Sequence, residues 1–437
     1  MANRTLLILT YYWPPAGGAG VQRWLKFVKY LSSMGYEPHI YTAENPEAPA
    51  QDESLLSDIP SNVVVIKKPI WEPFHFYKKL TRKKGNFNAG FLSEENNNKK
   101  KWTEKLALFI RANIFVPDAK MFWIKPSTKF LKQYIKQENI ELIISSGPPH
   151  SLHLIALNLK KKLGVKWIAD FRDPWTNIDF YQELPMLNMI DKKQKKLEKK
   201  VLEQADSVIV IGQEMKREFQ AIHPQIAIKV ISNGFDSEIA NQPILDKNFT
   251  ILHIGSINSD RTHESFYHAL HSLLHENPEL QHHLKIKFIG KVDFTSREMI
   301  KKYQLTPFTE YTNYIAYSQI SQIQQSARLL YLPLNNTPNA KGILTGKFFE
   351  YLAAKRPIIA QGPIDGDVAE ILKETNAGLI FGFNDDENLK EEIKRQFHLY
   401  LNESSTFNSK NIEQYSRKNL TIKLAEIINL EFKKSNS

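Results

Sequence analysis

The 437-residue chain contains no cysteine. This absence excludes disulfide bonds, thiolate catalysis and zinc sites with cysteine ligands, and it fits a reducing compartment. The apolar run at 5–13, TLLILTYYW, is too short to span a bilayer, and its context is that of a first strand rather than a signal peptide. We therefore expect a cytoplasmic protein.

Charge is unevenly distributed along the chain. The formal net charge is +11; residues 1–250 hold 36 Lys and Arg against 26 Asp and Glu, whereas the remainder holds 22 against 21. A basic first half indicates binding to nucleic acid, to an anionic membrane surface or to an anionic substrate. Charge alone does not choose among these three, so peripheral binding at the inner face of the membrane stays one interpretation.

Short β-branched runs alternate with helical patterns along most of the chain, and many of these runs are apolar on both faces, as buried parallel strands are. This alternation predicts an α/β protein with parallel sheets. A chain of this length exceeds the size at which a single core stops growing, so we expect two domains. The predicted strands are 5–12, 37–43, 62–68, 140–147, 165–171, 206–212, 249–255, 284–290, 328–334 and 356–362.

A polar segment, SNGFDSEIANQPILDKN at 232–248, separates the two strand-rich halves, and we place the hinge there. The predicted domains are 1–235 and 249–400. A helical segment follows them at 401–437.

Residues 69–126 interrupt the first domain with interleaved aromatic residues and lysines. A surface insertion with an amphipathic helix near 103–115 and a membrane or acceptor surface are both open interpretations. The lysine-rich run at 191–204 is interpreted as a solvated helix, because it also carries an apolar stripe of Leu197, Val201 and Leu202.

A loop with two prolines and three glycines, PPAGGAG at 14–20, follows the first predicted strand. It is not a dinucleotide fingerprint, because Arg23 stands at the third glycine position, and it lacks the Gly-Lys-Ser/Thr of a P-loop. The next segment predicts a helix with an apolar face and a stop at Gly35. Gly17 and Gly18 would let backbone N–H groups approach an anion, and a plain tight turn is the alternative. The apolar face comprises Val21, Trp24, Leu25, Val28 and Leu31.

Two polar groups follow predicted strands of the first half. His150 comes just after a strand that ends at Gly147, and the helix start predicted there disfavours an imidazolium, so we expect a neutral, hydrogen-bonding imidazole. A capping or structural histidine is the alternative. Asp170, Arg172 and Asp173 end the next strand, where three charges are costly unless they pair with each other or meet a ligand.

The second half has two similar places. Gly255 ends a strand, and the loop after it carries Arg261, whose guanidinium can bind a diphosphate through two hydrogen bonds. Thr345, Gly346 and Lys347 begin a helix, so the lysine adds positive charge at the positive helix end. One turn later a carboxylate, Glu350, can accept hydrogen bonds from ribose hydroxyls. A surface ion pair between Lys347 and Glu350 is the alternative.

These motifs together, GKFFEYLAAKRPIIA, SNGFD and YYWPPAGGAG, resemble the glycosyltransferase family 4 type of GT-B enzyme. The segments SSGPPHS and ADFRDPW are similar to those of a bacterial branch. The resemblance implies two Rossmann-like domains facing across a cleft, with a nucleotide diphosphate sugar bound mainly by the second. A saccharide or lipid-linked acceptor would bind mainly to the first, and the last helical segment would return to it.

The resemblance also implies roles for single residues. Gly17 and Gly18 would touch the donor diphosphate across the cleft, Arg261 and Lys347 would bind it, and Glu350 would hold the ribose. Gly342 stands where the family has the first glutamate of its E-x7-E motif, so backbone amides around 342–346 would have to recognise the sugar. Arg172 stands where many members have an active-site histidine, which leaves catalysis open among His150, Asp170, Arg172 and Asp173.

We therefore predict a retaining glycosyltransferase of bacterial surface polysaccharide or glycolipid synthesis, with no cofactor and no nucleic-acid partner. No metal is expected, because Arg261 and Lys347 already supply positive charge. In the family mechanism the leaving diphosphate takes the acceptor proton, so no protein nucleophile is needed. The rival interpretations are a nucleotide-sugar epimerase of the same fold and a non-enzymatic basic protein that binds polyanions or membranes.

Overall fold

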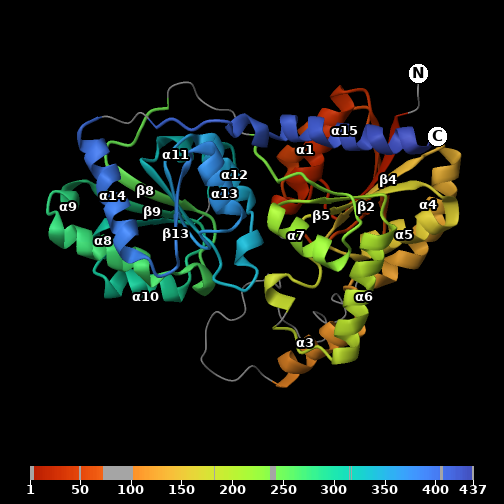
Figure 1. Ribbon diagram of the computed structural model, residues 1–437, viewed down its shortest axis with the longest axis horizontal. Coiled ribbons are helices and arrows are strands. Elements are labelled where there is room, and N and C mark those ends of the chain that lie inside the picture. Colours follow the sequence, from red (N-terminus) through yellow and green to blue (C-terminus); the bar gives the residue numbers. More distant parts are fainter. Residues whose placement is uncertain are drawn as a thin grey trace. The chain divides into compact units, whose positions relative to one another are not determined.

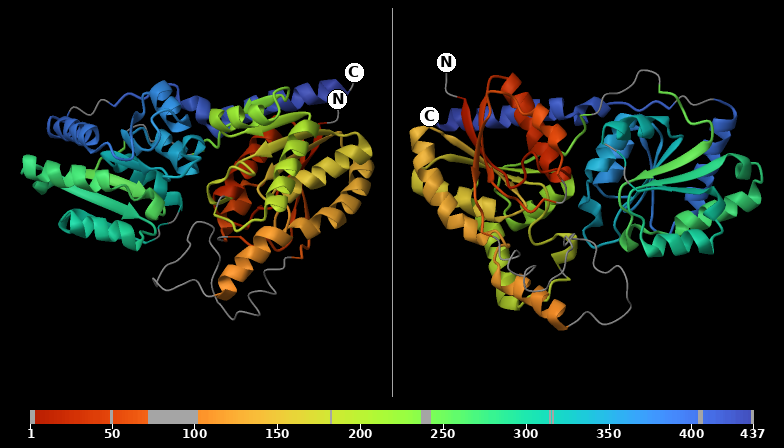
Figure 2. Two further views of the ribbon diagram at one scale, coloured as in Figure 1. Left: turned by 60° about the horizontal axis from the view of Figure 1, so that its bottom comes forward. Right: turned by 180° about the vertical axis from the view of Figure 1, so that it is seen from behind.

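A computed structural model describes residues 4–48, 51–71, 102–181, 183–236, 243–313, 315, 317–403 and 407–435. The chain divides into two compact units, residues 1–233 with 417–437 and residues 234–416. Their boundary falls inside the polar segment 232–248. Each unit has its own sheet with helices on both faces (Figures 1 and 2).

The first unit contains a seven-stranded sheet in the order β3-β2-β1-β4-β5-β6-β7. All of its strand pairs are parallel, so the carboxyl ends of the strands meet at a single edge. Its strands are β1 (Thr5–Leu9), β2 (Glu37–Ala43), β3 (Val64–Lys68), β4 (Leu142–Gly147), β5 (Lys166–Phe171), β6 (Ser207–Val210) and β7 (Ile228–Val230).

The helices of the first unit connect these strands in the manner of parallel crossovers. The apolar face predicted for the first helix is confirmed: its five residues are at most 1% exposed, and the helix ends just before Gly35, which has φ of 82°. The helices are α1 (Ala19–Ser33), α3 (Trp102–Ile114), α4 (Ile124–Gln137), α5 (Ser151–Leu163), α6 (Asn188–Gln204), α7 (Gln213–Ile222) and α15 (Arg417–Ser435).

The C-terminal helix α15 packs against α1 of the first unit (Figure 1). Leu420, Leu424 and Ile428 belong to the same apolar core as the apolar face of α1. At the edge of this core the Tyr36 hydroxyl donates to Asn429 Oδ1 over 2.8 Å, and the Ser207 hydroxyl donates to a carboxylate of α15. Burial of these side chains therefore fixes the end of the chain on the first sheet.

The second unit contains a six-stranded parallel sheet in the order β10-β9-β8-β11-β12-β13. The strand order reverses direction between β8 and β11, which is where open α/β sheets bind ligands beyond the carboxyl ends of their strands. The strands are β8 (Phe249–Ile254), β9 (Leu284–Ile289), β10 (Thr309–Thr312), β11 (Leu329–Pro333), β12 (Ile358–Gln361) and β13 (Gly378–Phe381).

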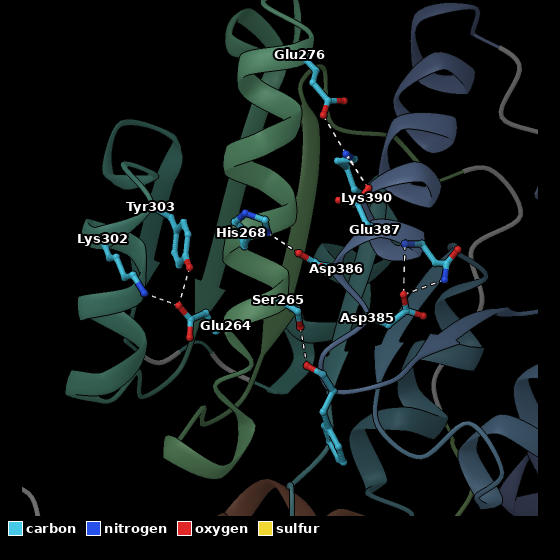
Figure 3. A network of polar contacts seen from close by, with 12 residues as sticks. Glu264, Ser265, His268, Glu276, Lys302, Tyr303, Asp385, Asp386, Glu387 and Lys390 are labelled. Carbon is cyan, nitrogen blue, oxygen red and sulfur yellow. Dashed lines mark hydrogen bonds and ion pairs between the residues drawn. The ribbon is translucent and has the colours of Figure 1, made fainter.

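Polar contacts join helix α8 to its neighbours α10 and α14 in the second unit (Figure 3). Glu264 accepts hydrogen bonds from Lys302 and Tyr303, and His268 Nδ1 lies 2.5 Å from Asp386. These contacts lie over an apolar core and are mostly exposed, so each one stabilises the unit only modestly. The helices are α8 (Glu264–Glu276), α9 (Leu280–His283), α10 (Phe294–Lys302), α11 (Tyr317–Ser326), α12 (Gly346–Ala354), α13 (Asp367–Thr375) and α14 (Asp386–Leu401).

The predicted α/β class with parallel sheets is confirmed, and all ten predicted strands are present. The helix expected near 103–115 is α3, but residues 72–101 of the predicted insertion lie outside the described residues. Within the described ranges, every helix is too short or too polar to cross a bilayer.

Candidate functional site

Polar residues gather where β8 and β11 end, at the reversal point of the second sheet. His253 and Gly255 lie at the end of β8, and Asn335 follows β11. The first turn of α12 brings Lys347 to the same place, since its Nζ lies 3.3 Å from His253 Nε2. Gly255 and Lys347 were both predicted at the donor site, and the structure places them next to each other.

Gly255 leaves room for the end of the lysine side chain and adopts a backbone conformation that favours glycine. Its φ is 111°, and a Cβ atom there would lie 2.7 Å from Lys347 Nζ and 2.8 Å from its Cε. Burial first, and then the charge of Arg261, lower the pKa of Lys347 to about 7, although Glu350 acts in the opposite direction. Within the described part of the chain this ammonium forms no ion pair, so an anion is the group that would stabilise its charge.

Arg261 lies at the end of a short 3-10 helix, Ser259–Arg261, directly after the β8 loop. Its Nε donates to Asn335 Oδ1 over 2.6 Å, and its Nη1 donates to the carbonyl of Ser256 over 3.1 Å. These two acceptors fix the plane of the guanidinium while adding no negative charge. Arg261 and Lys347 therefore form a positive pair that can bind a diphosphate.

The start of α12 supplies backbone donors. Thr345 caps the helix, with its hydroxyl accepting from the Phe348 amide, and the amides of Gly346 and Lys347 are the first-turn groups that have no partner inside a helix. The amide of Gly342 donates to the carbonyl of Asn339. The Ile343 amide likewise donates to the carbonyl of Ala340, so the amides of this segment that could bind the sugar are those after Ile343.

Glu350 lies one turn after Lys347 on the same helix. The backbone amide of Ile254 donates to the hydroxyl oxygen of the neighbouring Tyr351 over 2.9 Å, which fixes α12 against the end of β8. Glu350 is one helical turn from Lys347, which belongs to the proposed diphosphate site. Its carboxylate can therefore accept hydrogen bonds from the hydroxyls of a ribose attached to that diphosphate.

An Asp-x-Asp sequence at 365–367 lies close to the Gly342 turn, but its carboxylates have other roles. Asp365 binds Lys341 over 2.6 Å, and Asp367 is 2% exposed as the first residue of α13. Among the described residues, no three histidine, aspartate or glutamate side chains form a group suited to a metal ion.

In the first unit, His150 directly precedes α5 and stacks on Trp175, with ring centroids 4.5 Å apart and planes 3° apart. Burial, followed by the charges of His153 and Arg172, holds its pKa well below the ordinary value, which supports the neutral imidazole expected from the sequence. His150 does not cap the helix: Asp118 does, accepting from the amide and hydroxyl of Ser151.

Arg172 connects the loops at the carboxyl edge of the first sheet. Its Nη1 donates to the Gly20 carbonyl over 2.9 Å, and its Nη2 donates to the Pro148 carbonyl. It therefore joins the start of α1 to the loop that carries His150. Asp173 lies beside it, with a pKa raised by burial and held back by the charge of Arg172.

Asp170, by contrast, is completely buried and has three donors. Arg23 binds it at 2.8 Å, and Trp24 Nε1 and the Ser146 hydroxyl each donate to Oδ2 over 2.8 Å. Burial alone would raise its pKa, but the Arg23 charge and these hydrogen bonds hold the pKa below its ordinary value. These contacts favour the structural interpretation of Asp170 over a catalytic one, because its oxygens are engaged by the protein itself.

The glycine loop borders a cavity of about 340 Å³ at the carboxyl ends of β1 and β2. Gly17 is buried and Gly18, with φ of 96°, is exposed at the start of α1. The cavity has an apolar wall next to acidic and amide side chains, a combination that suits a sugar ring with its apolar face and hydroxyl groups. Its lining includes Trp13, Pro14, Glu44, Asn45, Glu47 and Gln51.

An apolar surface lies on α3 and the start of α6, and we name it the α3 patch. Asn113 joins the two elements by bonding the Pro185 carbonyl and the Leu187 amide, each over 2.8 Å. Exposed lysines of α6 adjoin it. The α3 patch comprises Leu106 (40% exposed), Phe109 (40%), Ile110 (37%), Ile114 (60%), Leu187 (47%) and Met189 (71%).

Sequence reasoning did not find three residues that the structure places at these sites: His253, Trp175 and Asp118. His253 lies within an apolar run that indicates a buried strand of the core. Trp175 and Asp118 lie in loops, and their contacts with His150 and α5 come from tertiary structure. The available signal was the polar character of a strand residue two positions before Gly255.

Two family models match the chain. The model described as Glycosyltransferase Family 4 covers residues 97–239, and the model described as Glycosyl transferases group 1 covers residues 235–418. The comparison with curated proteins found no match.

Solved structures with a similar fold span nearly the whole chain. A glycosyltransferase from Rickettsia africae is 15% identical with a TM-score of 0.60, covering 99% of this chain and 100% of its own. HepE from Anabaena, in complex with UDP-glucose, is 12% identical with a TM-score of 0.58, covering 97% and 99%. A putative UDP-N-acetylglucosamine 2-epimerase from Listeria monocytogenes is 11% identical with a TM-score of 0.55, covering 99% and 98%. These similarities establish the fold.

Proposed function

The chain is a glycosyltransferase of the family 4 type with the GT-B fold, and from this membership we propose that it transfers a sugar from a nucleotide diphosphate sugar with retention of configuration. The observation that carries the proposal is the convergence of Arg261, Lys347 and the first amides of α12 over Gly255. Two cations and a helix start within one small region favour a diphosphate over a single carboxylate.

In the proposed reaction the acceptor hydroxyl attacks the anomeric carbon on the face that the diphosphate leaves. The bond between that carbon and the phosphate oxygen breaks, the new glycosidic bond forms, and the hydroxyl proton passes to the departing diphosphate. Arg261 and Lys347 stabilise the negative charge that grows on the leaving group. Glu350 holds the nucleotide through its ribose.

Among the catalytic candidates we favour His150, whose buried ring lies against an aromatic side chain. Stacking on Trp175 fixes the ring plane, and its low pKa keeps the imidazole uncharged. A neutral imidazole can donate a hydrogen bond to a sugar hydroxyl or accept one, without repelling a cationic reacting centre as an imidazolium would. Arg172 positions the loop of His150 through the Pro148 carbonyl.

The acceptor is proposed to be a saccharide or a lipid-linked saccharide bound in the first unit. The cavity beside the glycine loop supports this assignment, since its volume of about 340 Å³ and its mixed lining suit a sugar ring. The α3 patch and the basic charge of residues 1–250 support peripheral binding to an anionic membrane, where a lipid-linked acceptor would be found. On this basis we propose a role in bacterial surface polysaccharide or glycolipid synthesis.

A nucleotide-sugar epimerase is the second candidate, because the Listeria protein shares the fold. The two family models favour transfer. The test is a thermal-shift screen with UDP-, GDP- and ADP-sugars, followed by product analysis of the stabilising donor. A donor present at 100 times its Kd raises the free energy of unfolding by about 2.7 kcal/mol. Release of free nucleotide that depends on an added acceptor supports transfer, whereas an isomerised nucleotide sugar formed without acceptor supports the epimerase.

A further inference from the structure

His253 lies behind Lys347 at the carboxyl edge of the second sheet. It is 1% exposed, in β8, and both of its ring nitrogens lie within hydrogen-bond distance of a partner. Nδ1 is 3.1 Å from the carbonyl oxygen of Tyr331 on the adjacent strand β11. Nε2 is 3.3 Å from Lys347 Nζ.

The contact with Tyr331 favours one tautomer. A carbonyl oxygen only accepts hydrogen bonds, so this contact favours a proton on Nδ1, and the backbone of Ser256 also bonds the ring. Nε2 then has a free electron pair and accepts from the ammonium of Lys347. Burial first, and then the charge of Lys347, hold the pKa of His253 well below its ordinary value, so the ring stays neutral.

A neutral acceptor differs from a carboxylate at this position. A carboxylate would hold the ammonium too, but it would cancel the charge and compete with an incoming phosphate. The imidazole fixes the direction of the ammonium and leaves its charge available. Gly255 completes the arrangement, because any side chain there would occupy the space of Lys347 Nζ.

We propose that His253 is a positioning residue for donor binding: it holds the Lys347 ammonium over Gly255, where that ammonium meets the diphosphate, and leaves its charge uncancelled. The inference rests on the proposed function, namely that this edge of the sheet binds a nucleotide diphosphate. His253 touches Lys347 and not the donor, so its effect on the ligand passes entirely through the lysine.

The hydrogen bond has a second consequence. Three charged or polar groups face the Lys347 ammonium: Arg261 from the β8 loop, Glu350 from α12 and His253 from β8. Burial and Arg261 favour the neutral amine, whereas an acceptor that bonds the ammonium favours the charged form. Loss of His253 Nε2 therefore makes Lys347 lose its proton at a lower pH, and diphosphate binding weakens correspondingly sooner as the pH rises.

The test is calorimetric titration of the parent, His253→Leu and His253→Gln with UDP, GDP and ADP, at several pH values between about 7 and 9, where the terminal phosphate is fully ionised. We expect His253→Leu to weaken nucleoside diphosphate binding roughly tenfold at pH 7.5, to lose further affinity with rising pH earlier than the parent, and to leave binding of the free nucleoside unchanged. His253→Gln offers an amide oxygen near the Nε2 position and should restore affinity to within about threefold.

Two further variants separate the possible outcomes. Lys347→Arg keeps its charge at every pH tested, so its affinity should not fall as the pH rises. His271→Leu removes another histidine that bonds a carbonyl through Nδ1, that of Tyr303, and it should bind like the parent. If His253→Leu remains folded and matches the parent in affinity and pH dependence while Lys347→Ala is weakened, the positioning role is wrong and the donor site stands. If the parent binds none of the nucleotides, or Lys347→Ala binds as the parent does, the donor site itself is wrong.

Discussion

Arg23 and Asp170 form a buried ion pair across the first unit, with 2.8 Å between Nη2 and Oδ1 and side chains that are 2% and 0% exposed. The pair joins α1 to β5, two elements that are far apart in the sequence. Arg23 also donates to the carbonyls of Ile231 and Ser232, so all of these groups meet in the interior. Hydrogen bonds that satisfy both charges make such a pair a structural unit rather than a reactive one.

Replacing Asp170 should therefore cost stability. Asp170→Ala leaves the Arg23 guanidinium buried without its counter-charge, and we expect the first unit to lose about 3–5 kcal/mol of unfolding free energy in urea titrations. Lys195→Ala, which removes an exposed ion pair with Asp191, should cost less than about 1 kcal/mol. Because the folded pKa of Asp170 is depressed, its stabilisation is present above the unfolded value of about 4 and is lost as the pH falls through the folded pKa. A fully stable Asp170→Ala that has lost only turnover would instead restore Asp170 as a catalytic residue.

Metal independence is the second prediction. Arg261 and Lys347 supply positive charge to the proposed diphosphate site, and the described residues contain no group of ligands suited to a metal there. Turnover should therefore survive an excess of EDTA within experimental error. A loss of turnover that magnesium or manganese restores would show that the two side chains are insufficient.

The third prediction concerns His150 and stereochemistry. Since the pKa of His150 lies well below the ordinary value, this ring should not change charge between about pH 6 and 8 and should impose no pH step on turnover there. His150→Ala should lower kcat by roughly 100-fold while changing donor affinity much less, as loss of a hydrogen bond in the transition state does. The exposed His282→Ala is the matched control. NMR of the product should show the donor's anomeric configuration; inversion would contradict the proposed mechanism.

The fold could be predicted from the sequence wherever strands are buried on both faces. The three strands that were missed, β7, β10 and β13, are edge strands of three or four residues. An edge strand is paired on one side only and is partly exposed, so it needs no continuous apolar run. The sequences IKV, TEYT and GLIF carry too little pattern to distinguish such strands from loops.

The site residues that could be predicted are those whose role is indicated by their immediate sequence neighbours. Gly255, Arg261 and Lys347 follow strands or begin a helix, and that context alone indicates an anion site. His253 was missed because its function depends on which atoms face its two nitrogens, and both partners, Tyr331 and Lys347, lie more than seventy positions away. The partner of Asp170 could not be predicted for the same physical reason, since Arg23 is brought to it only by the packing of α1.

Membrane binding through the α3 patch is the fourth prediction. Ile114 and Met189 are 60% and 71% exposed, and the first half of the chain holds the excess of positive charge. Vesicles with anionic lipid should retain the protein at low salt and release it as salt screens the attraction. The double variant Ile114→Glu, Met189→Glu should be retained several-fold less, because it loses apolar insertion and adds repulsion.

Phe294→Glu is the control for that experiment, since Phe294 is an equally apolar side chain, 76% exposed, on α10 of the second unit. It should be retained as the parent is. Equal recovery of the parent with neutral and anionic vesicles, or of the double variant with the parent, would contradict a membrane-binding role for the patch.

The last prediction separates the two halves of the donor, because Glu350 and Lys347 are proposed to bind different parts of it. Without Glu350, both ribose hydroxyls lose a charged acceptor, at a cost of roughly 2–4 kcal/mol, since hydrogen bonds to charged groups contribute about 1.5–3 kcal/mol each and are not additive. Glu350→Ala should therefore weaken nucleoside and nucleoside diphosphate alike, by about thirty-fold or more.

Lys347→Ala should weaken only the nucleoside diphosphate, because the ammonium over Gly255 contacts phosphate and not ribose. Its effect should also be largest below about pH 7, where the parent lysine is charged, and should shrink as the pH rises through the pKa of about 7. Calorimetric titration of both variants with both ligands gives four affinities and a direct comparison. If Glu350→Ala remains folded and binds both ligands as the parent does, the start of α12 does not hold the ribose. If Lys347→Ala also binds the diphosphate normally, the donor lies elsewhere on the second unit.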